Sequence, residues 1–87
     1  MGFKKLRGVN LPEEKQGLIR YTCLTVQEQP LSVQNKIRRL CGECGGEYSA
    51  ALWDVMCSNR NIVEIAQRHF VSERILYDLR KAFYEAW

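Results

Sequence analysis

The sequence has no long apolar segment and little of the alternation that marks β-strands. None of its apolar runs approaches the roughly 18–20 residues that a membrane-spanning helix needs. Apolar and polar residues do not alternate over any useful length, whereas helical spacing recurs. The first residues are basic but no apolar core follows them, so they lack the pattern of a secretory signal. We therefore expect a cytoplasmic, all-α protein that does not contact a membrane.

Residue types that carry catalysis are also scarce. The chain of 87 residues has one histidine, His69, and no serine or cysteine stands at a recognisable catalytic spacing from it. A chain of this length forms one small domain, which leaves little room for a deep active site that excludes water. We expect no enzymatic activity and no cofactor, and for His69 a role in packing or in bonding the adjacent turn.

Four cysteines remain as candidates for chemistry, and two of them stand three residues apart in the stretch CGECGG at 41–46. Such a pair begins many zinc knuckles, and in the cytoplasm cysteines are thiols or metal ligands rather than disulfides. Here, however, the pair continues a helical apolar stripe, and the other cysteines stand at no standard zinc spacing. We favour a helix end with buried thiols over a redox pair. The metal site kept as an alternative would use Cys23, Cys41, Cys44 and Cys57.

Basic residues exceed acidic ones by only three, so charge gives weak support for a nucleic-acid partner. Lys4, Lys5 and Arg7 are concentrated at the start of the chain. We expect residues 1–10 to form a flexible basic arm. A role in following the minor groove of DNA is the alternative.

Helical spacing predicts about five helices in a single domain over residues 11–87. Pro12 begins the first helix, with two glutamates after it, and Pro30 stops it. Ser32 is the expected cap of the second helix, and the glycines at 45–46 end it. The segment after these glycines is apolar nearly all round, which is typical of a central helix. The expected helices span about 12–28, 33–44, 47–57, 62–69 and 73–86.

Residues 61–86 have the pattern of a DNA-binding helix-turn-helix. Its two helices cross closely, so the first carries a small residue, and apolar residues stand before it, in the turn and twice on the second helix. Asn61 and Ser72 are the expected N-caps. Phe70 stands where the turn usually has glycine, which predicts a slightly different or longer turn. An ordinary pair of bundle helices is the alternative. The required positions hold Ile65, Ala66, Val71, Leu76 and Leu79.

The stretch VEIAQRHFVSERILYDLRKAFYE resembles the helix-turn-helix of small phage-type transcriptional regulators, the RinA/ArpU group, and more distantly region 4 of sigma-70 factors. The preceding IRRLCGECGGEYSAALWDVM resembles the helices that these regulators place ahead of the motif. The likeness covers about residues 33–87, and residues 1–30 match nothing that we recognise. It implies sequence-specific binding of duplex DNA to regulate genes of a phage or an integrated element.

The resemblance also implies which side chains meet DNA. Arg74 would be the main base contact, because its planar guanidinium can bind guanine at two points. Glu73 and Asp78 would accept from a base amino group or orient an arginine. The start of the first helix offers free N–H groups to phosphate, with Arg60, Asn61 and Arg68 nearby. The implied base-facing set is Ser72, Glu73, Arg74, Tyr77, Asp78, Lys81, with Tyr84 farther along the same face.

Two other functions share this pattern. The near-neutral charge of residues 60–87 favours a helical interaction module that docks on RNA polymerase or on another protein. A DNA-recognition subunit of a recombination or packaging system is a third reading. Trp87 could form an exposed apolar edge, and such an edge would suit a homodimer.

Overall fold

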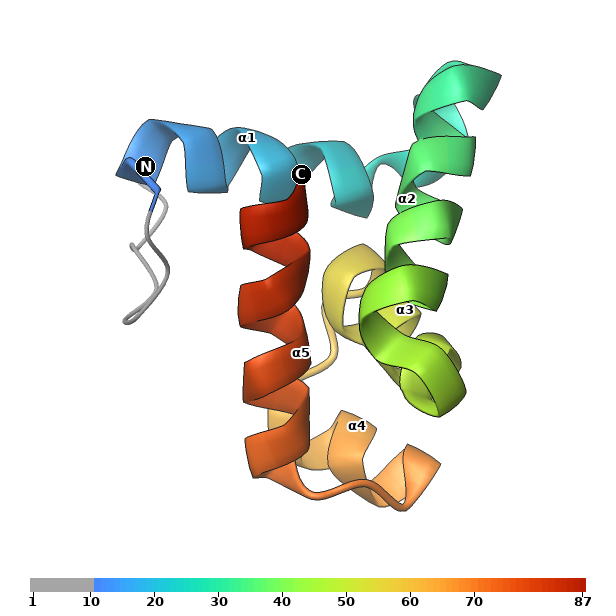
Figure 1. Cartoon of the computed structure of the whole chain (residues 1–87), viewed down its shortest axis with the longest axis vertical. Helices are drawn as coiled ribbons and strands as arrows, with labels where there is room; N and C mark the ends of the chain where they lie inside the picture. Colours follow the sequence, from blue (N-terminus) through green and yellow to red (C-terminus); the bar gives the residue numbers. More distant parts are fainter. Residues whose placement is uncertain (1–10) are drawn as a thin grey trace.

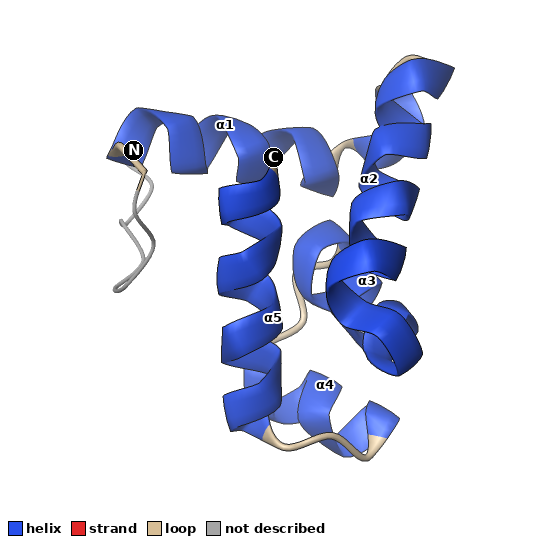
Figure 2. Ribbon diagram, in the orientation of Figure 1, coloured by secondary structure: helices blue, strands red, loops and turns tan. Residues whose placement is uncertain are grey.

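In the computed structural model, residues 11–87 are described, and they form α-helices and short 3-10 helices without any strand (Figure 1, Figure 2). The prediction of an all-α fold is confirmed. The basic arm expected at residues 1–10 lies outside the described residues. No helix within 11–87 is long and apolar enough to cross a bilayer. The elements are α1 (Glu13–Leu24), η1 (Val26–Glu28), α2 (Leu31–Gly45), η2 (Gly46–Tyr48), α3 (Ser49–Cys57), α4 (Ile62–His69) and α5 (Glu73–Ala86).

Both of the first two α-helices begin directly after a proline. Pro12 and Pro30 have φ near −60°, the angle that proline fixes and that leads readily into a helix. The Pro30 carbonyl accepts the N–H groups of Val33 and Gln34, each at 3.0 Å. The predicted capping role of Ser32 is therefore wrong: the helix starts at Leu31, two residues earlier than expected, so Ser32 lies inside its first turn.

The glycine pair ends α2 as the sequence predicted. Gly46 has a φ of 53°, which residues with a side chain rarely adopt. Cys41 and Cys44 both lie within α2, before this break, so the CGECGG stretch is the end of a helix. The tight backbone turn that a zinc knuckle needs is absent from this stretch.

The core is built around α3, which contacts each of the other four α-helices. Its residues Ala51, Leu52, Val55 and Met56 are all buried. Figure 1 shows α3 between α5 and the lower part of α2, with α1 lying across the end at which α5 finishes. A helix packed from several sides needs apolar residues all round, which explains the composition of this segment.

Arg20 ties α1 to the end of α3. Its guanidinium donates to the carbonyl oxygen of Val55, to that of Met56 at 2.9 Å and to that of Ser58 at 3.0 Å. The last carbonyl groups of a helix have no partner inside the helix, and a cation suits its negative end. Arg20 therefore satisfies the end of the central helix from a distant part of the chain.

Candidate nucleic-acid interface

The interior of the α4–α5 pair matches the pattern expected from the sequence. Ile65 and Leu76 are fully buried, and the small residue Ala66 and the turn residue Val71 are each 9% exposed. Leu79 is partly buried and packs against the same core. Both helices also contact α3. The buried side of α5 therefore packs against α2, α3 and α4, and its other side is left to solvent.

The turn between α4 and α5 is short, because the backbone of Phe70 takes a left-handed conformation that ends α4 at once. Phe70 has φ 55° and ψ 45°, the left-handed conformation usual for glycine at this position. The N–H of Val71 donates to the carbonyl of Ala66 at 3.0 Å and closes the end of α4. The expectation of a different or longer turn is wrong, because the phenylalanine takes up the glycine-like conformation itself. Its side chain is 96% exposed.

Both predicted N-caps of this pair are present. The side-chain oxygen of Asn61 accepts the N–H of Glu64 at 2.8 Å, and that of Ser72 accepts the N–H of Ile75 at 3.2 Å. Each cap satisfies one of the backbone donors that a helix start leaves without a partner. The side-chain oxygens of Asn61 and Ser72 are thus already engaged in holding the ends of α4 and α5.

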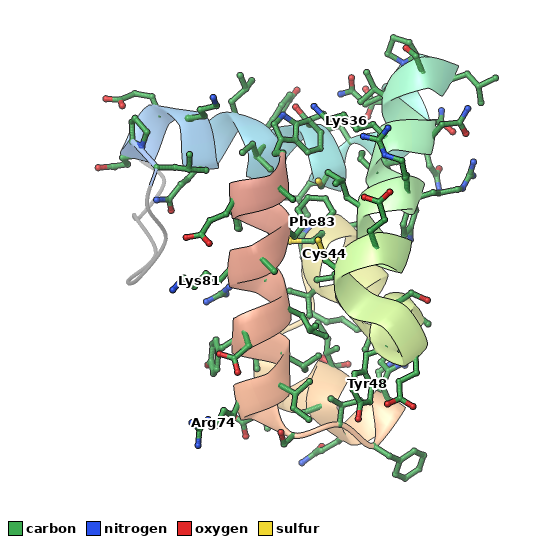
Figure 3. All side chains as sticks on the ribbon, in the orientation of Figure 1. Lys36, Cys44, Tyr48, Arg74, Lys81 and Phe83 are labelled. Carbon is green, nitrogen blue, oxygen red and sulfur yellow. The ribbon has the colours of Figure 1, made fainter. Side chains whose placement is uncertain are left out.

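The residues expected to face DNA share one exposed side of α5, here called the outer face. In Figure 3, Arg74 and Lys81 project from α5 away from the other helices. Within residues 11–87, neither of them forms an ion pair with a carboxylate. Their two positive charges are balanced in number by two acidic residues on the same face. The exposed members are Ser72, Glu73, Arg74, Tyr77, Asp78 and Lys81.

Tyr84 does not belong to the outer face, and its expected place there is wrong. Only 2% of it is exposed. Arg20 and Cys23 of α1 lie close enough to affect its hydroxyl electrostatically. Burial raises the pKa of the Tyr84 hydroxyl above its ordinary value. Because α1 covers the final turns of α5, the exposed stripe ends before Tyr84.

Arg60 and Arg68, two of the three residues expected near phosphates, converge on a carboxylate that sequence reasoning overlooked. Asp54 of α3 accepts a hydrogen bond from Arg60 Nη1 at 2.9 Å, and its other oxygen lies 3.1 Å from His69 Nε2. Arg68 Nε lies 3.8 Å from that second oxygen. We call these four residues the Asp54 cluster. Part of the charge of Arg60 and Arg68 is thus compensated within the chain.

The Asp54 carboxyl is ionised more readily than usual despite its burial. Burial by itself would raise its pKa, but hydrogen bonds from Ser58, His69 and Arg60 hold the pKa below its ordinary value. One sequence signal could have found it: Asp54 is the one charged residue in the apolar segment 48–57. Buried carboxylates are rare unless paired, so its position should have suggested partners.

The four cysteines are not arranged as a metal site. All are free thiols, and within residues 11–87 no group of three or more His, Cys, Asp or Glu side chains could hold a metal ion. Burial raises the pKa of Cys41 to about 12. A hydrogen bond with Cys57, together with burial, also raises the pKa of Cys23. The same hydrogen bond lowers the pKa of Cys57.

Trp87 is partly covered by its own chain. Its ring centroid lies 6.0 Å from that of Phe83, and Lys36 Nζ of α2 lies 4.1 Å above its ring. These contacts fasten the end of α5 to α2. Trp87 is therefore partly buried, and the exposed apolar edge that it could have formed is in part covered.

No protein-family model, curated protein or solved structure matches this chain. The resemblance to phage-type regulators therefore stays an expectation from the sequence. A function has to be inferred from the geometry of the α4–α5 pair and from the chemistry of the side chains around it.

Proposed function

We propose that this chain binds duplex DNA sequence-specifically, through α4, the turn and α5, as a small phage-type transcriptional regulator. The observation that carries the proposal is the division of α5 into two sides. One side is buried against α3 and α4, and the other presents a row of exposed polar side chains. A helix held in this way can enter the major groove, where polar side chains read the edges of bases.

The proposed roles follow from chemistry and position. Arg74 has a planar guanidinium on the outer face and forms no ion pair with a carboxylate among the described residues, which suits bidentate binding of guanine. Glu73 and Asp78 accept from cytosine or adenine amino groups, and Lys81 binds phosphate. No step in this function is catalytic, and the protein would act in the cytoplasm, where its DNA is.

The Asp54 cluster has a supporting role in this proposal. It links the central helix α3 to both ends of α4. Arg60 lies just before α4, and Arg68 and His69 are the last two residues of α4. A motif whose first helix is fixed at both ends holds its second helix in a defined orientation. The cluster is therefore a positioning device, and its arginines, already paired with Asp54, are weaker phosphate ligands than unpaired arginines would be.

Selection from a random pool of duplexes tests the specificity. The immobilised chain should enrich one common short sequence over successive rounds at a salt concentration near physiological. The chain with all outer-face charges neutralised (Glu73→Gln, Arg74→Gln, Asp78→Asn, Lys81→Gln) is the control and should enrich nothing in common. A pool that stays random with the wild-type chain would contradict sequence-specific binding.

A second candidate is docking on RNA polymerase or another protein, and one observation favours it. Val63 of α4 and Phe70 of the turn are exposed large apolar residues, with 49% and 96% of their surfaces accessible. Exposed aromatic residues are typical of the centres of protein interfaces. A pull-down on the polymerase that is lost with Phe70→Ala and kept with Arg74→Ala would favour this candidate.

A further inference from the structure

A cavity of about 210 Å³ lies between α1, the end of α3, the start of α4 and α5. It is lined from both parts of the helix-turn-helix and from α1, for which the sequence suggested no role. Three of its seven lining residues are arginines and none is acidic. The lining residues are Arg20, Val55, Arg60, Asn61, Ile62, Arg80 and Tyr84.

Two of these arginines carry charges that nothing in the described chain neutralises. Arg20 donates to three backbone carbonyls, which are neutral groups. Arg80 lies over the ring of Tyr77, with its guanidinium carbon 5.0 Å from the ring centroid. Within residues 11–87, no carboxylate forms an ion pair with either arginine.

The two guanidinium groups also disfavour each other. Burial lowers the pKa of Arg80, and the charge of Arg20 lowers it further. Like charges in a partly desolvated place are unfavourable, and a bound anion would relieve both effects. Arg60 adds less, because it is already bonded to Asp54 at 2.9 Å.

The rest of the lining offers further groups for an anion. Tyr84 contributes its hydroxyl from α5. Asn61 and Ile62 form the start of α4, where the first backbone N–H groups have no partner within the helix and the helix dipole is positive. The asparagine cap engages the N–H of Glu64 and leaves those earlier N–H groups to other acceptors.

We propose that this pocket is a phosphate-binding site, in which Arg20 and Arg80 grip the phosphate oxygens beside Tyr84 and the start of α4. Planar guanidinium groups match pairs of oxygens on a tetrahedral oxyanion, which a single lysine would not do. The phosphate comes either from the backbone of bound DNA or from a free phosphorylated small molecule. Only the first source rests on the proposed function; the site itself does not.

Thermal unfolding in sodium phosphate, against sodium chloride of equal ionic strength, tests the site directly. The wild-type chain should show a rise in Tm of roughly 5–10 °C at ten times the Kd for phosphate, and the rise should grow with the logarithm of the phosphate concentration. Phosphate also stabilises proteins by exclusion from their surfaces, so the decisive quantity is the difference in this rise between wild type and variant. Arg80→Gln should keep only the part of the rise that comes from exclusion.

The matched control is Arg39→Gln, which removes the same charge from an exposed part of α2 outside the pocket. It should keep the full rise in Tm. An equal rise in wild type and Arg80→Gln, or no rise in wild type, would overturn the proposal.

A titration of the wild-type chain with inorganic phosphate, followed by NMR, tests the site without relying on the folding of any variant. The side-chain NMR signals of Arg20 and Arg80 should move together with inorganic phosphate and saturate at one Kd, while those of Arg39 stay in place. Unmoved Arg20 and Arg80 signals would overturn the site, whatever the variants do.

DNA binding separates the two sources. If a backbone phosphate fills the pocket, Arg80→Gln should weaken binding to all duplexes alike and lower the salt slope by about 1. If a small molecule fills it, the DNA affinity of Arg80→Gln should equal that of wild type. Were the wild-type chain to bind no DNA, the proposed function would fail. A phosphate-dependent rise in Tm would still support the pocket.

Discussion

Phe70 holds a backbone conformation that suits glycine better than any residue with a side chain. Its φ is 55°, and the left-handed region costs such residues roughly 1–2 kcal/mol. Its ring is 96% exposed, so packing within the chain does not offset this cost. Phe70→Gly should therefore raise the free energy of unfolding in urea by about 1 kcal/mol.

Phe70→Ala is the matched control for this prediction, because alanine removes the ring but keeps the Cβ atom. Its free energy of unfolding should stay within about 0.5 kcal/mol of wild type. A glycine variant no more stable than the alanine variant would mean that the turn is not strained. Strain kept at an exposed aromatic residue points to a contact with a partner.

Arg74 is the residue on which base reading depends most in our proposal. Arg74→Ala should weaken binding to the selected duplex by about 1–3 kcal/mol, and binding to random duplexes much less. Fluorescence anisotropy with both duplexes measures the difference. Arg39 lies exposed on α2, and Arg39→Ala should leave both affinities nearly unchanged. An equal loss on the two duplexes would remove Arg74 from base reading.

At the scale of the elements, the Asp54 cluster holds α4 against α3. Asp54→Asn keeps the shape of the side chain but removes the charge that faces Arg60, Arg68 and His69. Removing one member of a buried ion pair is strongly destabilising, but these partners are partly exposed and screened by solvent. We expect a loss of roughly 2 kcal/mol in the free energy of unfolding, measured in urea.

Asp78→Asn is the control for that loss. Asp78 lies exposed on α5, and within residues 11–87 it forms no ion pair. Its replacement should change the free energy of unfolding by less than about 0.5 kcal/mol. Similar losses in the two variants would show that the Asp54 cluster does not fasten α4.

The same cluster predicts a dependence on pH. The pKa of Asp54 is lower in the folded chain than the ordinary value of 3.8, so between the two values the unfolded chain binds more protons. The stability from Asp54 is therefore full above the ordinary pKa and is lost as the pH falls through the folded pKa. Urea midpoints measured from about pH 6 to pH 3 should fall less steeply for Asp54→Asn than for wild type. Parallel curves would contradict this.

Local patterns in the sequence predicted the helices well, because helix ends depend on nearby residues. Asn61, Ser72 and Gly46 end or begin helices through their own backbone or side chains. Ser32 failed as a cap because the neighbouring Pro30 offers an earlier start. Phe70 failed as a sign of a longer turn, because a non-glycine residue can adopt the left-handed conformation when the surrounding fold favours it.

At the scale of the whole molecule, the features missed from the sequence all depend on contacts between distant segments. Arg20 reaches carbonyl groups some 35 residues away along the chain, which no local pattern reveals. Tyr84 is buried because α1 happens to cover that turn of α5. The outer face of α5 could be predicted from spacing alone. The Asp54 cluster and the arginine pocket could not, since the first joins α3 to α4 and the loop before it, and the second is lined from four helices.

Contacts within the molecule also limit the strength that the proposed DNA binding can have, because several arginines already bond to other groups of the chain. Arg60 and Arg68 face Asp54, and Arg20 holds the end of α3. The positive charge left for phosphates is therefore modest. We expect DNA binding that is weak on random sequence and depends on the outer face for its strength on the preferred site.

Fluorescence anisotropy of the wild-type chain on random duplex DNA, across a series of salt concentrations, tests the central claim most directly. With two to four phosphate contacts, the affinity should fall by roughly 10- to 150-fold between about 50 and 200 mM salt. Such a slope would support a DNA-binding helix-turn-helix. No binding at the lowest salt would contradict it, and docking on a protein would then become the leading account of the exposed face of α5.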